Sequence, residues 1–309
     1  PPGSSVDYWW VVKDAKGNTV ETAPTRVQFD DNRYSWSSLT EGKVTVYWYQ
    51  GGKSFARELM AVAQQALARL AGDTGAELEK PAKLFIYANA QDLKGAMIYP
   101  QEWTGGVAFT RYGVIAIGIA PSNLGWGKRA IAHELTHLVI HQVTLNPYND
   151  LPTWLDEGLA MHTEGVLSPQ LSTLLDKAIA KGSLISVRSL ASPFSAYAGE
   201  SYLSYAQSYS LVDFLISNYG QAKMLELLNT FKQGSSYDAA LEKVYGFDMD
   251  GLDALWQEYV SEQYQPTKVT ATTTVRMHPA LIGLLAALAT GLLLALGLFV
   301  ESWVWRRGQ

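Results

Sequence analysis

The 309-residue sequence contains no cysteine, so neither disulfide bonds nor thiolate metal ligands contribute to its structure. This absence is compatible with an exported protein. The sequence also lacks any tract of basic residues, and its net charge is −5. A nucleic-acid partner is therefore not expected.

Histidine is scarce as well, yet two of the five histidines stand in the segment His133-Glu134-Leu135-Thr136-His137. The surrounding residues 128–143 are predicted to form a helix, because apolar residues recur there at helical spacing. Residues four apart lie one turn apart on the same helix face. His133 and His137 therefore present two imidazoles to a single ion. Glu134 points about 100° away around the helix and is placed to act on a metal-bound water.

Local signals predict the bounds of two helices around this segment. Gly125 and Gly127 are expected to precede the first helix, and Asn146-Pro147 is expected to end it. Asp150-Leu151-Pro152 is expected to open a second helix, with Pro152 near its first turn. Two helices joined by a short connection normally pack antiparallel.

A catalytic zinc ion usually takes three ligands from the protein and leaves one position open, so a third ligand is needed. Glu157 lies one turn inside the second helix, and antiparallel packing brings it back against His137. We therefore predict a Zn2+ site formed by His133, His137 and Glu157. The alternative is that both histidines are core residues and that Glu157 is a solvated helix residue.

These residues carry a family resemblance. The His133–His137 segment, followed by Leu151-Pro152-x-Trp154-Leu155-x-Glu157-Gly158-Leu159-Ala160, resembles the gluzincin (HExxH...E) zinc metallopeptidases, and among them the peptidase MA-like domains of bacteria. The resemblance extends over about residues 47–264. It implies an α+β, thermolysin-like domain in which a small mixed sheet precedes a helical subdomain. It also implies that Glu134 is the general base that takes the proton from a zinc-activated water.

The resemblance also suggests an oxyanion donor. In related aminopeptidases, a tyrosine that opens a helix downstream of the third ligand stabilises the tetrahedral oxyanion. The matching stretch here is residues 204–208, at the start of a helix expected to run to about Tyr219 and to stop at Gly220. We expect Tyr205 to be this catalytic residue, with Tyr209 as the alternative. A third interpretation is that both tyrosines are packing residues.

The sequence leaves the roles of four further residues near the motif unassigned. His141 lies one turn beyond His137, and His162 lies about one turn beyond Glu157. Each is interpreted as orienting a ligand, as contacting substrate, or simply as a partly buried helix residue. Asp156 and Glu164 are both candidates to hydrogen-bond a ligand imidazole, and their spacing does not choose between them.

Two short strands are predicted at 105–109 and 113–117, around a turn at Arg111-Tyr112. In gluzincins, an edge strand before the active-site helix binds the substrate main chain. The aminopeptidases of the group carry an acid on this strand that binds the substrate amino terminus, and this chain has Ala108-Phe109 there. The difference favours an endopeptidase over an aminopeptidase, although Glu102 or Glu164 remain alternative sources of a carboxylate. A plain structural sheet edge is the other interpretation.

Residues 280–300 carry no charge and nothing more polar than Thr290. As a helix with a rise of about 1.5 Å per residue, they match the roughly 30 Å hydrocarbon core of a bilayer. Trp303 and Trp305 fit an interfacial belt, and Arg306-Arg307 follows them, which favours a cytoplasmic carboxy terminus and an extracytoplasmic peptidase domain. We thus expect a single-pass protein of the cell membrane that contacts lipid through this helix; a buried core helix is the alternative.

Small residues recur at every fourth position of this span, and they permit a homodimer through the membrane helix. They are Gly283, Ala287, Gly291 and Ala295. Small residues are also common in membrane helices in general.

The expected domain order is a small β module (1–50), a metallopeptidase domain (51–265), a linker (266–279), the membrane helix (280–300) and a short cytoplasmic tail (301–309). The chain begins without a methionine or a signal-like apolar stretch, so we expect the β module to be incomplete.

Strands are predicted within the module at 9–12 and 44–49, with a hairpin turn at 14–18. Further elements are predicted as helices at 54–71, 168–181, 221–232, 237–245 and 252–264, and as a strand at 83–88.

The sequence therefore leads to one main functional hypothesis and two alternatives. The main one is a membrane-anchored zinc peptidase, an endopeptidase, that hydrolyses a peptide or protein substrate. The alternatives are an aminopeptidase, and a membrane-anchored binding or assembly protein with a structural or vestigial zinc site. An intact Glu134 and the lack of an evident fourth ligand favour catalysis.

Overall fold

The structure is a computed structural model that describes residues 1–97, 105–195 and 198–263. The predicted linker, membrane helix and tail lie outside these residues. Within the described ranges, no helix combines the length and the apolar character that crossing a bilayer requires.

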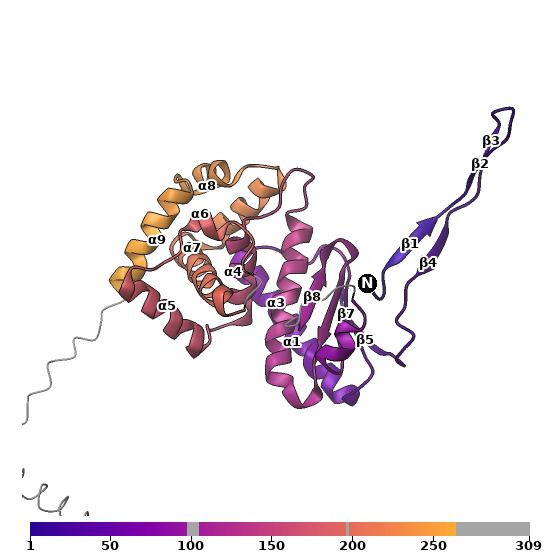
Figure 1. Cartoon of the computed structure of the whole chain (residues 1–309), viewed down its shortest axis with the longest axis horizontal. Helices are drawn as coiled ribbons and strands as arrows, with labels where there is room; N and C mark the ends of the chain where they lie inside the picture. Colours follow the sequence, from indigo (N-terminus) through magenta and orange to yellow (C-terminus); the bar gives the residue numbers. More distant parts are fainter. Residues whose placement is uncertain (98–104, 196–197, 264–309) are drawn as a thin grey trace, which may run out of the picture. The chain divides into compact units, whose positions relative to one another are not determined.

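A five-stranded mixed sheet forms the framework of the first half (Figure 1). Its order is β5 (Ser37–Glu41), β6 (Val44–Trp48), β7 (Ala82–Tyr87), β9 (Val114–Gly118) and β8 (Gly106–Phe109). The central strands β6, β7 and β9 run parallel, and β5 and β8 are antiparallel edge strands. All five residues of β9 are buried, as expected for a strand covered on both faces.

Two long helices, α1 (Gly52–Thr74) and α3 (Leu124–Val143), pack together beside the sheet (Figure 1). The buried stripe of α1 includes Phe55, Leu59 and Leu70, so the predicted amphipathic helix is confirmed and extends one turn further, to a left-handed cap at Gly75. The other face of the sheet is covered by aromatic residues and the short helix α2 (Ala90–Lys94). The aromatic cluster comprises Tyr34, Trp36, Tyr47, Tyr49, Phe85 and Tyr87.

The second half is helical. Its helices are α4 (Thr153–Glu164), α5 (Pro169–Lys181), α6 (Val187–Leu190), α7 (Ala198–Lys232), α8 (Tyr237–Tyr245) and α9 (Met249–Gln263). Helix α4 packs against both α3 and α7, and therefore joins the helical half to the half that contains the sheet. The predicted α+β class, with a small mixed sheet and a helical subdomain, is confirmed.

Two helix starts differ from the prediction. Helix α3 begins at Leu124 and includes both glycines that were expected to precede it. A Cβ on Gly127 would lie 2.3 Å from Cγ2 of Ile119, so glycine there permits close packing of the helix on the chain that leaves β9. The predicted start of α4 is confirmed, because Pro152 is the N-cap residue and the helix begins at Thr153. Helix α7 already begins at Ala198.

The predicted stop at Gly220 is confirmed as a break within α7. Gly220 has φ 78° and ψ 174°, which is not helical, and the chain resumes as helix directly after it. A positive φ of this kind strains residues that carry a Cβ. Two short 3₁₀ turns, Thr110–Tyr112 and Pro121–Asn123, complete the described elements.

The first thirty residues form two separate two-stranded antiparallel sheets. Strand β1 (Ser5–Tyr8) pairs with β4 (Thr25–Gln28), and β2 (Val11–Lys13) pairs with β3 (Thr19–Glu21). Every residue of these four strands is exposed. The strand predicted at 9–12 is confirmed only for Val11 and Val12, which belong to β2, because Trp9 and Trp10 lie between β1 and β2. The turn at 14–18 is confirmed.

The predicted boundary at residue 50 does not coincide with the edge of the sheet. Strands β5 and β6 lie before it, yet β6 pairs with β7 in parallel register over Val44–Trp48. The residues from Ser37 onward are therefore part of the peptidase sheet, because strand pairing and burial tie them to β7.

Candidate metal centre and active site

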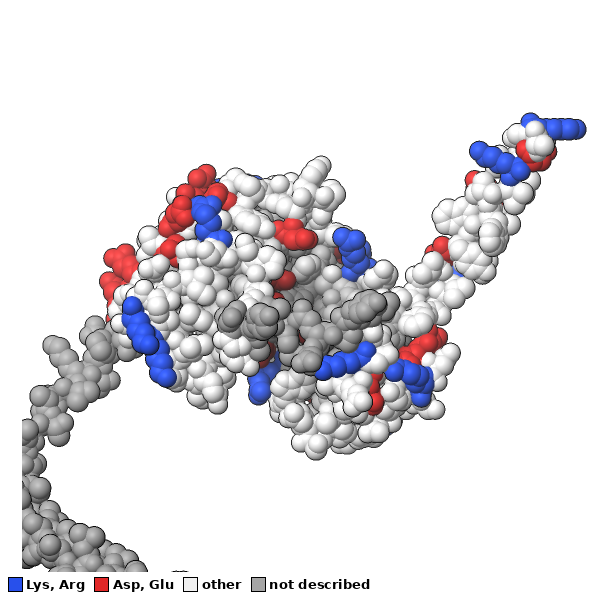
Figure 2. All heavy atoms as spheres, viewed as in Figure 1, with Lys and Arg blue, Asp and Glu red and all other residues white. Residues whose placement is uncertain are grey.

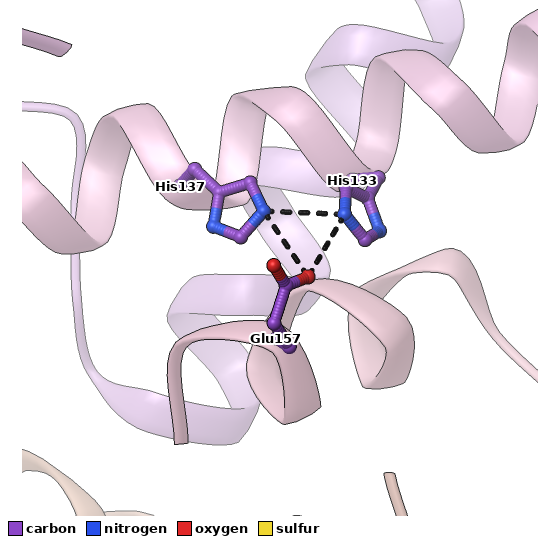
Figure 3. Close-up of side chains that lie close together, drawn as sticks. All are labelled: His133, His137 and Glu157. Atoms are coloured by element: carbon purple, nitrogen blue, oxygen red, sulfur yellow. Dashed lines mark hydrogen bonds and ion pairs between the residues drawn. The ribbon is translucent and has the colours of Figure 1, made fainter. Parts of the chain in front are cut away.

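Helix α3 presents His133 and His137 one turn apart, as their spacing predicts, and their Nε2 atoms lie 3.1 Å apart (Figure 3). The apolar side chains of the same helix, including Leu135 and Leu138, are fully buried and fix its rotation against the core. The two imidazoles are therefore held on the face of α3 that points toward α4.

Helix α4 brings Glu157 to the same point. Its Oε2 atom lies 3.4 Å from Nε2 of His133 and 3.6 Å from Nε2 of His137 (Figure 3). The three predicted ligands thus each offer one atom within 4.8 Å of the others. A second group that shares His137, together with His141 and Asp156, also meets this distance, but its atoms already hydrogen-bond one another.

The turn between α3 and α4 depends on Asn146. Its Oδ1 accepts hydrogen bonds from the backbone N–H groups of Tyr148 and Asn149, at 2.9 and 3.1 Å, and its Nδ2 donates to the carbonyl oxygen of Phe231 at 3.1 Å. Asn146 therefore closes the turn and anchors it to α7. Asparagine suits this role because its amide both donates and accepts.

The hydrogen bonds on the far side of each ring show that these residues fit a zinc ion. Nδ1 of His133 donates to Oε1 of Glu164 at 2.8 Å, and Nδ1 of His137 donates to Oδ1 of Asp156 at 3.0 Å. With its proton on Nδ1, each neutral ring directs the Nε2 lone pair at its neighbour. Oε2 of Glu157 is buried and has no hydrogen-bond partner. Three lone pairs that converge on one buried point need a cation between them.

The charges of the site agree with this interpretation. Burial alone would raise the pKa of Glu157, but the histidines beside it, His137 foremost, lower the pKa to about 2, so the carboxylate is ionised. Burial alone would lower the pKa of His133, but the carboxylates of Glu157 and Glu164 beside its ring raise the pKa to about 9. Without a metal ion, the carboxylates thus favour a proton on the rings, and a bound cation would replace that proton.

Glu134 lies beside the edge strand β8. A Cβ on Gly106 would stand 2.8 Å from Oε1 of Glu134, so glycine leaves the room that this carboxylate occupies. Burial raises the pKa of Glu134, while the charges of His133 and His137 and the backbone N–H of Ala108 partly oppose that rise. A carboxylate whose pKa moves up toward neutrality is a stronger proton acceptor.

Tyr205 and Tyr209 face different surroundings on α7. Burial raises the pKa of Tyr205, and the negative charges of Glu157 and Glu134 raise it further. The ring of Tyr209 instead lies 5.7 Å from that of His162. Tyr205 does not open its helix as expected, because α7 begins at Ala198, two turns earlier.

The structure shows interaction partners for the four residues whose roles the sequence left unassigned. Both predicted carboxylates are used, because Glu164 holds His133 and Asp156 holds His137. Nε2 of His141 lies 3.0 Å from Oδ2 of Asp156.

His162 lies outside the metal centre, with its two ring nitrogens 3.3 Å from Asp73 and 3.4 Å from Asp213. Arg129, whose Nε lies 4.0 Å from Oε2 of Glu164, was not predicted as a residue of this site. Its position four residues before His133 on the same helix face was an available signal.

Comparison with known proteins assigns the chain to a family. A sequence profile described as "Peptidase MA superfamily" matches residues 62–262, which is more than half of the chain. The chain therefore belongs to the Peptidase MA superfamily. A search of curated proteins gives no match.

Similar solved structures include an M1 zinc metallopeptidase from Deinococcus radiodurans, 15% identical, with 82% of this chain and 61% of that chain covered and a TM-score of 0.40. Yeast LTA4 hydrolase in complex with Bestatin is also 15% identical, with 84% of this chain and 42% of that chain covered and a TM-score of 0.40. The chain thus spans less than two thirds of the length of these structures.

Proposed function

We propose that this chain is a zinc-dependent peptidase that hydrolyses internal peptide bonds of a peptide or protein and is anchored in the cell membrane by its C-terminal segment. The observation that carries the proposal is the convergence of His133, His137 and Glu157 beside a buried glutamate, Glu134, at a sheet edge.

The residues of the site have separate roles in the proposed reaction. His133, His137 and Glu157 would hold the zinc ion, which when bound polarises the scissile carbonyl and activates a water molecule. Glu134 accepts the proton of that water and then delivers it to the leaving amine. Tyr205 donates a hydrogen bond from its phenol to the developing oxyanion. The raised pKa of Tyr205 keeps this phenol protonated, as a donor must be.

The substrate main chain is proposed to pair with β8. Gly118 donates to the carbonyl oxygen of Gly105, so the alternating pattern of an antiparallel pair turns the polar groups of Gly106 and Ala108 to the open edge. A peptide in extended conformation can add there as a further strand. Its backbone then passes over Glu134, which lies against Gly106.

Cleavage of internal bonds is supported by the lack of a suitable carboxylate on this strand. Ala108 and Phe109 cannot bind a free amino terminus. Glu164, an alternative source of the acid, is engaged by His133 at 2.8 Å; Glu102 lies outside the described residues. Peptides blocked at the amino terminus should therefore be cleaved as well as free ones.

The membrane part of the proposal is supported by the sequence of 280–300, which carries no charge over about the thickness of a bilayer. With Arg306-Arg307 on the cytoplasmic side, the peptidase domain lies outside the cytoplasm. The small residues at every fourth position of the span further suggest a homodimer through this helix.

The experiment that tests the function combines elemental analysis with hydrolysis of a mixed library of blocked peptides by the full chain. We expect one zinc ion per chain and hydrolysis that stops on chelation and returns with zinc. Glu134→Gln should keep the zinc and lose hydrolysis, by a factor of about 10³ or more. Glu242→Gln, an exposed position on α8, is the matched control. Full activity of Glu134→Gln would overturn the mechanism.

A further inference from the structure

A cavity of about 630 Å³ opens where β8 ends and α3 ends. No step of the proposed reaction uses it. Its walls come from the turn after β8, the last turn of α3, the connection to α4 and the residues before β7. They include Lys80, Arg111, Tyr112, His141, Leu145 and Asp150.

This cavity lies along the same strand edge as the reacting groups. Glu134 lies against Gly106 at the start of β8, and Thr110, just after β8, lines the cavity. Four residues of extended chain span about 13 Å. On α3, His141 lines the cavity seven residues after Glu134, a rise of about 10 Å along the same direction. The cavity is therefore three or four peptide residues away from the bond that is cut.

The geometry of strand addition decides which side of the substrate reaches the cavity. Antiparallel pairing is the more stable way to extend the edge formed by β8. A peptide that runs antiparallel to β8 has the residues before its scissile bond beside Ala108 and Phe109, and then beside Thr110. The part of the substrate that enters the cavity thus precedes the cleaved bond.

The charged side chains in the lining indicate which kind of side chain the cavity can bind. Among the described residues, neither Lys80 nor Arg111 has an ion-pair partner, and Asp150 is the single acidic side chain in the lining. Tyr112 and Leu145 are 57% and 63% exposed and add apolar surface beside the two cations. His141 is already turned toward Asp156.

We propose that this cavity is a specificity pocket for an acidic side chain of the substrate, three or four residues before the scissile bond, held by Lys80 and Arg111. The proposal rests on the peptidase function and names the class of substrate, namely acidic peptide segments.

The test uses pairs of blocked peptides that differ only by Glu or Gln at the third or the fourth position before one cleavable bond. We expect the unaltered full chain to prefer the Glu peptide in kcat/KM by about fivefold at low salt, with a smaller preference at high salt. Arg111→Gln and Lys80→Gln should each reduce this ratio, and the double variant should bring it near one. Asp150→Asn should increase it, because the competing carboxylate is gone.

Arg57→Gln is the matched control, since it removes one exposed cation of α1 outside the cavity and leaves the charge of the pocket intact. Its ratio should equal that of the unaltered chain. The proposed pocket is contradicted if the Glu peptide and the Gln peptide have the same kcat/KM in the unaltered chain. It is also contradicted if the double variant leaves their ratio unchanged. A preference found only for acids after the scissile bond overturns the assigned direction.

Binding provides a second readout that does not need turnover. Fluorescence anisotropy of the same labelled peptides with Glu134→Gln should show tighter binding of the Glu peptide, and the added Arg111→Gln and Lys80→Gln changes should remove the difference. If the unaltered chain cleaves no peptide, the proposed function is contradicted. The difference in binding between the Glu and the Gln peptide still tests the specificity pocket, because it does not depend on cleavage.

Discussion

Oε1 of Glu164 lies 2.8 Å from Nδ1 of His133, although 31 residues separate them in the chain. Glu164 follows Glu157 by two helical turns, so both acids project from the same side of α4 toward α3. One helix thereby supplies a predicted ligand and a group that orients another ligand. The arrangement leads to the first prediction.

Glu164→Gln and Asp156→Asn are expected to weaken zinc binding by about 10- to 100-fold each, because each loses a carboxylate that fixes a ligand ring. The measurement is competition for zinc against a chelator of known affinity. Asp176→Asn, an exposed change on α5, is the control. Unchanged zinc affinity in both variants would show that packing alone orients the rings.

Tyr205→Phe is expected to lower kcat by about 10²- to 10³-fold, since it removes one oxyanion donor, while zinc content and KM change little. Tyr209→Phe is the matched control on the same helix, and its kcat should stay within about twofold. Both are measured with one blocked peptide at saturating concentration. A larger loss in the Tyr209 variant would transfer the role to that residue.

Gly158→Ala is expected to destabilise the fold by about 2 kcal/mol or more and to weaken zinc binding. An added Cβ would lie 2.4 Å from the carbonyl oxygen of Ser208 and 2.6 Å from Cγ2 of Val212, so α4 must move away from α7 and carry Glu157 with it. Urea unfolding and zinc competition measure the two effects. Gly125→Ala is the control, because nothing lies within 4 Å of its added Cβ.

Asp31 gives a prediction on acid stability. It is 8% exposed and accepts hydrogen bonds from Arg33, at 2.8 and 2.6 Å, and from the Tyr87 hydroxyl at 2.8 Å. The Arg33 hydrogen bonds lower the pKa of Asp31 in the folded chain. The ionised carboxylate therefore stabilises the fold above the unfolded pKa of about 4, and this stabilisation is lost as the pH falls through the folded pKa.

Asp31→Asn should accordingly cost about 2 kcal/mol of unfolding free energy at pH 7 and clearly less at pH 3. Unfolding is measured at both pH values with the metal removed, so that loss of zinc does not contribute. Asp30→Asn, at an exposed neighbouring position, should show no such difference between the two pH values. An equal cost at both pH values would contradict the assignment.

The final prediction concerns residues 280–300. The full chain should fractionate with membranes and resist extraction by carbonate, whereas a chain that ends at residue 264 should be released and should keep its activity on blocked peptides. The physical reason is that a charge-free run of this length is too costly to leave in water. Release of the full chain by carbonate alone would contradict membrane anchoring.

The face in Figure 2 shows acidic and basic side chains interspersed, with acidic residues gathered over α8 and α9. No stripe of basic residues crosses that face. The charged groups that matter for the proposed function are those of the metal centre and of the cavity beside β8.

Periodicity and capping residues are local, so the sequence alone determined much of the secondary structure. The spacing of His133 and His137 placed two imidazoles on one turn. The helix predicted at 168–181 agrees with α5, which Ser168 and Gly182 cap. Local signals were misleading at Gly127, because glycine there serves a close contact with Ile119 that only the folded chain creates.

The tertiary structure decided what depends on distances between separate elements. Spacing could not tell whether Asp156 or Glu164 supports a ligand ring; the crossing of α4 over α3 lets both do so. It likewise decided the surroundings of the two tyrosines: the charges of Glu157 and Glu134 act on Tyr205, whereas the ring of Tyr209 lies 5.7 Å from that of His162. A helix fixes only relative directions along itself, and packing against its neighbours sets its absolute rotation.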